Sequence, residues 1–150
     1  MTNKVNKKTI SRLCIVQVIY QLYFFNYKRD ILEILEDTLD YYNEYISKEE
    51  FDLDYKIKVN KNFILNIINV FTKNREEIEL KLKSLLEKCS YEPDLIAQCI
   101  IKSGISEIML NNTNTPKKVI ISEFTNIAAS LINDSKIAVV NSCLDKVANT

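Results

Sequence analysis

The chain has 150 residues, of which 47% are hydrophobic, and its 20 basic and 20 acidic side chains give a formal net charge of zero. This length suits one compact domain that buries about two-thirds of its unfolded surface. A single glycine excludes a glycine-rich phosphate-binding loop, and the absence of histidine removes the commonest general base, leaving carboxylate or lysine chemistry formally open. Composition therefore argues against nucleotide hydrolysis.

The first predicted helix covers about residues 9–27 and is apolar on most sides, which places it near the centre of the domain. Residues 1–29 contain six basic and no acidic side chains. Asp30 and Glu33 have the spacing of a capping box and predict the start of a second helix. Its outer face is acidic, since residues 30–54 contain ten acidic and one basic side chain. A zero net charge therefore does not exclude a basic binding face.

Residues 47–55 lose the apolar period and are predicted to form a loop before a third helix, which carries apolar residues from Ile57 to Phe71. Asn74, with Glu77 three residues later, predicts the cap of a fourth helix through Leu86. Pro93 suits the first position of a fifth helix, which continues through Ile108 and ends before the polar run 111–114.

Thr115 followed by Pro116 is the clearest start signal, because a good cap residue precedes a proline suited to the first helical position. The sixth helix is expected to end near Ile132, and either Asn133 or Asp134 can cap the seventh. Helical periodicity along the chain, together with few glycines and prolines, predicts an all-α fold. We expect residues 1–150 to form a single compact bundle of about seven helices.

The four cysteines, at 14, 89, 99 and 143, lie within apolar helical patterns and are expected to be buried free thiols, which indicates a cytoplasmic protein. Four dispersed thiolates without a C-x-x-C pair do not suit a structural zinc site, and no metal is expected. The apolar runs are far shorter than the roughly 20 residues that cross a bilayer, so we predict no membrane-spanning segment.

Residues 116–148 carry a motif: P-K-K-V-I-I-S-E, then I-A, then D-S-K-x-x-x-V-N-x-x-L-D-K. It resembles the NusB family pattern P-x-K-V-x-I-N-E followed by D-S-x-K-F-V-N-G-V-L-D. Residues 94–110 are similar to the preceding family helix, with Lys102 where arginine is usual and Gly104 where alanine is usual. Residues 14–20 read C-x-V-Q-x-x-Y and resemble the first family helix. The resemblance covers roughly half of the chain.

This resemblance implies a helical bundle that binds boxA-type sequences of ribosomal RNA leaders jointly with the small-subunit ribosomal protein NusE. The complex helps RNA polymerase to read through terminators, which is transcription antitermination. The resemblance implies no cofactor and no covalent chemistry. It also suggests that the partner face lies on the fourth and fifth helices. The sequence leaves open whether the protein is a monomer or a homodimer.

The RNA-binding face is expected to combine basic side chains that neutralise phosphates with an aromatic ring that stacks on an unpaired base. Basic groups at a helix start gain nothing from the helix dipole, so three lysines at the starts of the last two helices suggest an external anion. Charged termini and exposed lysines are, however, often simply solvated, and aromatics on an apolar helix are more often core. The predicted RNA-binding residues are Lys4, Lys7, Lys8, Arg12, Tyr27, Lys117, Lys118 and Lys136.

Two alternatives remain beside the antitermination factor. The family's arginine-rich start is thinned here, with Thr9 and Ile10 where two further arginines commonly stand, which suggests a helical protein-interaction domain with weak or lost RNA binding. The other is an RNA-binding accessory domain akin to that of ribosomal RNA cytosine methyltransferases. The chain ends at Thr150 with no cofactor-binding region, which argues against this second alternative.

Overall fold

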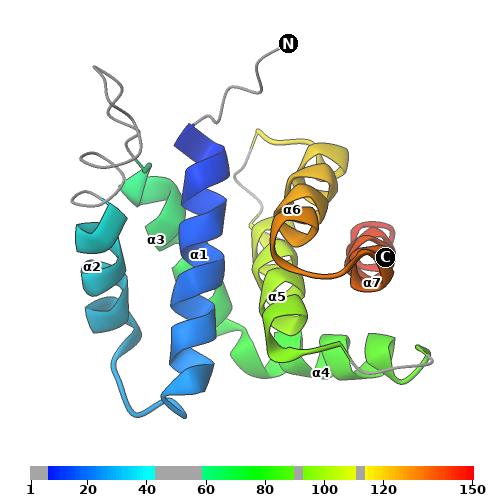
Figure 1. The fold of residues 1–150 in the computed structure, drawn as a ribbon, viewed down its shortest axis with the longest axis horizontal. Helices are drawn as coiled ribbons and strands as arrows, with labels where there is room; N and C mark the ends of the chain where they lie inside the picture. Colours follow the sequence, from blue (N-terminus) through cyan, green and yellow to red (C-terminus); the bar gives the residue numbers. More distant parts are fainter. Residues whose placement is uncertain (1–6, 43–58, 90–92, 111–113) are drawn as a thin grey trace. The chain divides into compact units, whose positions relative to one another are not determined.

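A computed structural model describes residues 7–42, 59–89, 93–110 and 114–150, and within these ranges all regular secondary structure is helical (Figure 1). The described residues form seven helices, which confirms the all-α prediction: α1 (Lys7–Phe24), α2 (Ile31–Tyr41), α3 (Lys61–Lys73), α4 (Arg75–Leu86), α5 (Leu95–Met109), α6 (Lys117–Leu131) and α7 (Asp134–Ala148). The chain divides within α3 into two compact units, Met1–Leu65 and Asn66–Thr150. A single domain over 1–150 stays a prediction.

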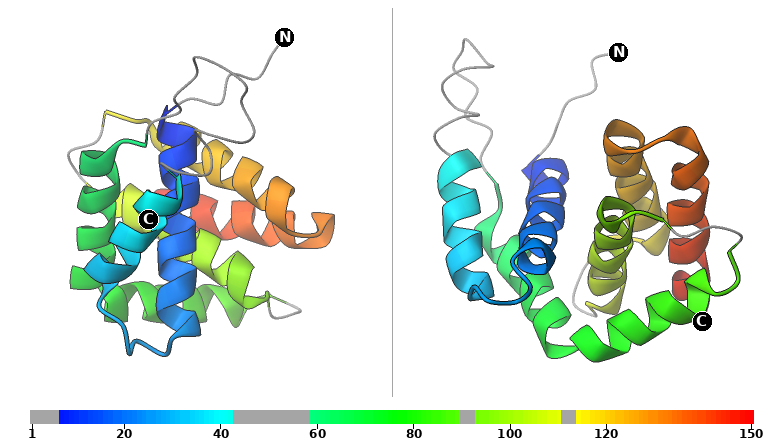
Figure 2. Two further views of the ribbon diagram at one scale, coloured as in Figure 1. Left: turned by 60° about the vertical axis from the view of Figure 1, so that its left-hand side comes forward. Right: turned by 60° about the horizontal axis from the view of Figure 1, so that its bottom comes forward.

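In the first unit α1 and α2 pack side by side (Figure 2). The side chain of Gln21 on α1 donates a hydrogen bond of 2.9 Å to the hydroxyl of Thr38 on α2. The predicted apolar character of α1 is matched by its burial, since Cys14, Ile15 and Val18 are fully inaccessible to solvent. A helix that is apolar on most sides has to be covered on most sides.

The helix α1 ends three residues earlier than predicted because of a left-handed turn. Asn26 and Tyr27 have φ angles of 52° and 62°. The amide of Tyr27 donates to the carbonyl of Leu22 and the amide of Asn26 to that of Tyr23, both at 3.0 Å. This is the Schellman pattern that closes a helix, and asparagine accepts the left-handed conformation more readily than most residues. Asn26 was the signal in the sequence for this helix end.

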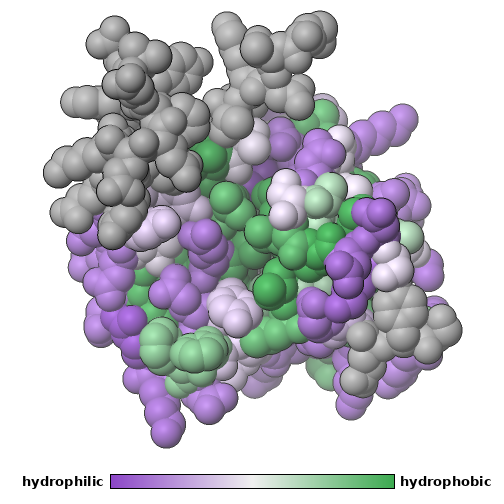
Figure 3. Space-filling model, in the orientation of Figure 1, coloured by the Kyte–Doolittle hydropathy of each residue, from purple (hydrophilic) through white to green (hydrophobic). Residues whose placement is uncertain are grey.

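The helix α2 starts where its capping residue predicted. The Asp30 carboxylate accepts a hydrogen bond of 3.2 Å from the amide of Leu32, which satisfies one of the unpaired amides at the helix start. Ile34, Leu35 and Thr38 form its buried face. Hydrophilic side chains cover the outer side of α2 (Figure 3), in agreement with the predicted acidic face.

The start of α3 is tied to the start of α1 by a relay of hydrogen bonds in the first unit. The Asn60 side chain accepts from the Phe63 amide at 3.1 Å and so caps α3. The amide of Asn60 donates to the Ser11 hydroxyl at 2.8 Å, and that hydroxyl donates to the carbonyl of Lys7 at 2.7 Å. The predicted loop 47–55 and residue Ile57 lie outside the described residues.

Three of the predicted start signals in the second unit are corrected. Asn74 precedes α4 as expected, but its side-chain amide donates to the carbonyl of Val70 at 2.9 Å and so closes α3. Pro93 lies outside α5, because the next residue, Asp94, is the cap and accepts from the Ala97 amide at 2.9 Å. Pro116 has an extended backbone, with ψ at 146°, and therefore precedes α6 instead of opening it.

The second unit is built on α5, which packs against α4, α6 and α7. A Cβ atom added to Gly104 would lie 2.6 Å from Cδ2 of Leu144. That distance is far below van der Waals contact, so α5 and α7 meet closely because position 104 carries no side chain. All four cysteines are free thiols, and Cys14, Cys99 and Cys143 are buried.

None of the described helices is both long and apolar enough to span a lipid bilayer.

Candidate nucleic-acid interface

A basic edge lies at one end of the first unit, and we define it by Lys7 and Lys8 in the first turn of α1 and Lys61 in the first turn of α3. All three side chains are exposed. The hydrogen bond between Asn60 and Ser11 holds these two helix starts together. The edge thus presents positive charge from two segments that lie far apart in the sequence.

An aromatic ring underlies the basic edge. The ammonium group of Lys8 lies 5.5 Å from the centre of the Phe63 ring, and the guanidinium carbon of Arg12 lies 5.3 Å from the same centre. A cation within about 6 Å of a ring centre is attracted to the face of the ring. Phe63 therefore restrains the Lys8 side chain while its charge remains accessible.

Arg12 has a different environment from the one expected for a phosphate ligand. Its side chain is only 1% exposed. A buried guanidinium has to be compensated by groups inside the protein. The position of Arg12 is thus that of a packing residue, and a phosphate could reach it only after the side chain had moved.

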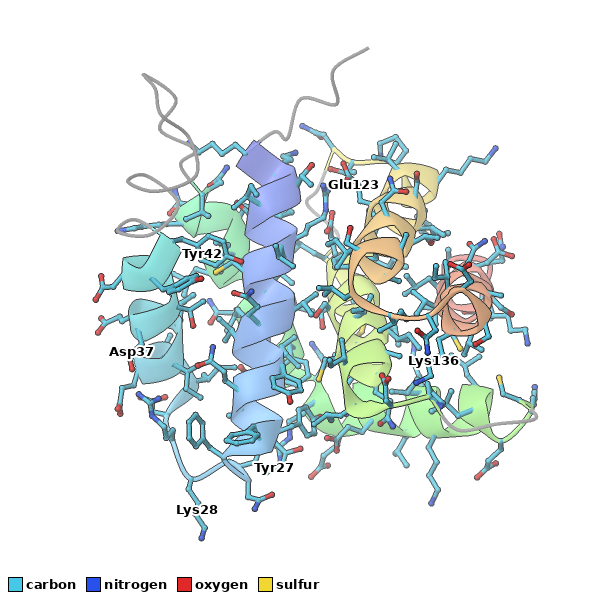
Figure 4. All side chains as sticks on the ribbon, viewed as in Figure 1. Tyr27, Lys28, Asp37, Tyr42, Glu123 and Lys136 are labelled. Carbon is cyan, nitrogen blue, oxygen red and sulfur yellow. The ribbon has the colours of Figure 1, made fainter. Side chains whose placement is uncertain are left out.

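Tyr27 is exposed, at 40%, but lies beyond the opposite end of α1 from the basic edge (Figure 4). At roughly 1.5 Å per residue, the helix from Lys8 to Phe24 is about 24 Å long. The Tyr27 and Tyr23 rings meet edge to face, with ring centres 5.0 Å apart. The structure therefore separates Tyr27 from Lys7 and Lys8.

The predicted lysines at the start of α6 differ in their surroundings. The ammonium group of Lys117 donates a hydrogen bond of 3.1 Å to the carbonyl of Ala148, at the end of α7. A cation is favoured at a helix C-terminus, so Lys117 has a favourable acceptor within the second unit. Lys118 is exposed.

Lys136, in the first turn of α7, forms an ion pair of 2.7 Å with the Asp94 carboxylate at the cap of α5. The Asp94 carboxylate of the same chain, and not an external anion, thus accounts for this lysine at a helix start. Lys136 is about 18 Å along α7 from Ala148, where Lys117 binds. The structure therefore does not bring Lys117 and Lys136 together. Lys4, the remaining predicted residue, lies outside the described residues.

Replacing Asp94 by alanine is expected to lower the free energy of unfolding by about 1–2 kcal/mol, since it removes a helix cap and an exposed ion pair. Asp94→Asn keeps a capping oxygen and should cost less. The hydrogen bond from Lys136 and that from the Ala97 amide both lower the pKa of Asp94. The ion pair therefore contributes above the ordinary aspartate pKa and is lost as the pH falls through the lowered value. Urea denaturation of wild type and Asp94→Asn should show a difference that shrinks below about pH 4. A difference independent of pH would contradict this role.

Two charged residues of the segment 94–110, which resembles a family helix, are buried in α5. Lys102 is 5% exposed and Glu107 is fully buried. The ammonium group of Lys102 lies 3.8 Å from the carboxylate of Glu79 on α4, and burial lowers the pKa of Lys102. Among the described residues no group of three or more acidic or cysteine side chains is arranged to hold a metal ion.

Lys61 is the member of the basic edge that the sequence did not reveal. Asn60 and Lys61 read as an ordinary cap and first turn of a helix. The contact that places them beside Ser11 joins residues 49 positions apart, and local patterns carry no information on such a contact.

The comparisons with known proteins agree on one family. Residues 9–149 match the model described as the NusB family. The chain is 33% identical to the transcription antitermination protein NusB of Rickettsia bellii over 150 residues, which covers 99% of this chain and 94% of that protein. It is 32% identical to the NusB protein of Rickettsia typhi over 149 residues, covering 98% and 94%. The solved structure of T. maritima NusB shares the fold, with a TM-score of 0.73 at 21% identity over 94% of this chain and 89% of that one.

Proposed function

The chain belongs to the NusB family, whose members are non-catalytic antitermination factors, and from this membership we propose that it supports transcription antitermination by binding boxA-type ribosomal leader RNA. The observation that carries the RNA-binding part is the basic edge, where Lys7, Lys8 and Lys61 are exposed on two helix starts that are tied together. Lysines that neutralise phosphates release counterions, which favours binding of a nucleic-acid strand.

The charge distribution of the first unit supports a limited RNA path. The outer side of α2 carries Glu33, Glu36, Asp37 and Asp40, all exposed. These carboxylates repel phosphates, so we expect the RNA to follow the basic edge. Lys4, which lies outside the described residues, stays a predicted phosphate ligand. In the second unit Lys118 is the best phosphate ligand of the predicted set, while Lys117 and Lys136 have acceptors of their own.

We further propose that the protein partner is NusE and that the pair joins the antitermination complex of RNA polymerase in the cytoplasm. The partner face suggested by the resemblance, α4 and α5, has a hollow of about 370 Å³. Glu79, Lys83 and Gln98 are among the residues that line it. Its mixed charge suits a polar protein surface better than a nucleic acid.

Titration of fluorescently labelled boxA-type RNA with the full chain, alone and with NusE, tests the proposal. We expect binding that is weak alone and strengthens when NusE is present. Equal, weak binding of boxA-type RNA and a scrambled RNA in both titrations would contradict a specific role.

The alternative of a protein-interaction domain that has lost RNA affinity gains support from the burial of Arg12 and the internal pairing of Lys136. This alternative predicts no RNA binding with or without NusE, so the same titration decides between the two.

A further inference from the structure

A cluster of aromatic rings lies at the end of α1, opposite the basic edge, and the RNA-binding proposal does not use it. The Tyr20 and Phe24 rings stack with centres 6.3 Å apart, and the Phe24 and Phe25 rings meet edge to face at 5.4 Å. Phe24 is nevertheless 64% exposed. An exposed group of large apolar side chains on a small protein commonly marks an interaction site.

The exposed rings are held in place by the backbone. Phe24 is the last residue of α1, and Tyr27 lies in the turn closed by the hydrogen bond from its amide to the carbonyl of Leu22. The turn directs the chain into α2, whose cap is Asp30. Because this backbone is fixed and the rings contact neighbouring rings, a partner that docks here orders only side chains and loses less conformational entropy than on a flexible segment.

The charge next to these rings is negative. From Phe24 to Tyr41 the chain has five carboxylates and two basic residues. The Asp37 carboxylate points outward from α2, and Lys28 extends from the turn (Figure 4). The side chain of Glu36, the residue before Asp37 on α2, is also exposed. Such a field repels nucleic acid and attracts a cationic polypeptide.

An arginine of the chain itself shows which kind of side chain fits against this surface. The guanidinium carbon of Arg29 lies 5.2 Å from the centre of the Phe25 ring. The same guanidinium pairs with Glu33 at 2.8 Å and with Asp37 at 2.6 Å. An aromatic face next to carboxylates suits a guanidinium, which stacks on one and forms charge-assisted hydrogen bonds with the other.

We propose that the end of α1 and the outer face of α2 form a docking surface for a basic segment of a protein partner. Arginine or lysine side chains of that segment lie against the exposed Phe24 and Tyr27 rings and pair with carboxylates such as Glu36. Apolar side chains of the segment cover the rest of the aromatic cluster. This inference goes beyond the proposed function, because it assigns a second surface to the first unit, at the opposite end of α1 from the RNA.

The test uses the full chain and a labelled 12-residue peptide of alternating arginine and leucine pairs, with a second peptide in which glutamate replaces arginine. We expect the basic peptide to bind and the acidic peptide not to bind. The variants Phe24→Ala and Glu36→Lys, each made separately, should lower the affinity for the basic peptide by about fivefold or more, as expected for an anchor residue. Leu80→Ala is the matched control, since Leu80 on α4 is 67% exposed and should leave the affinity unchanged. Thermal melts verify that each variant is folded.

Several results would overturn the proposal. They are an equal loss in the Leu80→Ala control, failure of the basic peptide to bind, and a fall in boxA-type RNA affinity in Phe24→Ala. Concentration-dependent sedimentation that Phe24→Ala abolishes would instead identify a second copy of the chain as the occupant. RNA affinity measured on the same variants keeps the two proposals separate, since we expect it to be unchanged in Phe24→Ala.

Discussion

Reversal of two charges on the basic edge, in the double variant Lys7→Glu and Lys8→Glu, is expected to weaken binding of boxA-type RNA by about tenfold or more. Each lysine that neutralises a phosphate of a single strand contributes about 0.7 to the slope of log affinity against log salt. Loss of both lysines should therefore reduce the magnitude of this negative slope by about 1.4. Fluorescence anisotropy titrations between roughly 50 and 200 mM salt measure both quantities. Neither side chain is buried, so the stability of the fold should change little.

The control for this variant has the same net charge and a different location. Lys73 and Lys88 are exposed, at the end of α3 and just after α4, in the second unit. Their replacement by glutamate should leave the salt slope close to that of the wild type. An equal fall in both double variants would show that only net charge matters, and an unchanged slope in the first would remove Lys7 and Lys8 from the interface.

Replacement of Arg12 by alanine is expected to affect folding strongly, by about 3–5 kcal/mol in the free energy of unfolding, because it leaves the groups around a buried charge without compensation. Lys8→Ala, which removes an exposed charge over the same Phe63 ring, should cost no more than about 0.5 kcal/mol. Urea denaturation followed by circular dichroism measures both. Arg12→Lys keeps the charge without the planar guanidinium and should have an intermediate effect.

The opposite result would support the prediction from the sequence that Arg12 binds RNA. If Arg12→Ala were as stable as the wild type and bound RNA much more weakly, Arg12 would have to leave its buried position to bind a phosphate. RNA binding is therefore measured at a temperature at which both the wild type and Arg12→Ala are folded.

Local signals located the helices well where one residue determined the boundary. Asp30 capped α2 as predicted, because its carboxylate reaches an amide two residues away. The prediction failed where two adjacent residues competed. Pro93 and Asp94 both suit a helix start, and the carboxylate that accepts from Ala97 determined the boundary. At Asn26 the helix ended without glycine, which is the more common signal for a left-handed turn.

The candidate site was less predictable than the fold, because its charges depend on contacts between distant residues. Lys117 and Ala148 are 31 positions apart, and Lys136 and Asp94 are 42 apart. A helical pattern shows that a lysine lies at a helix start, but it does not show which acceptor the fold brings to that lysine. The same limit hid the burial of Arg12 and the proximity of Lys61 to the start of α1.

The close approach of α5 and α7 at Gly104 makes positions 104 and 144 depend on each other. Cδ2 of Leu144 occupies the space that a methyl group at 104 would need, so an alanine at 104 fits only if the end of the Leu144 side chain turns aside. The effects of substitutions at 104 and 144 on the free energy of unfolding are therefore expected not to be additive.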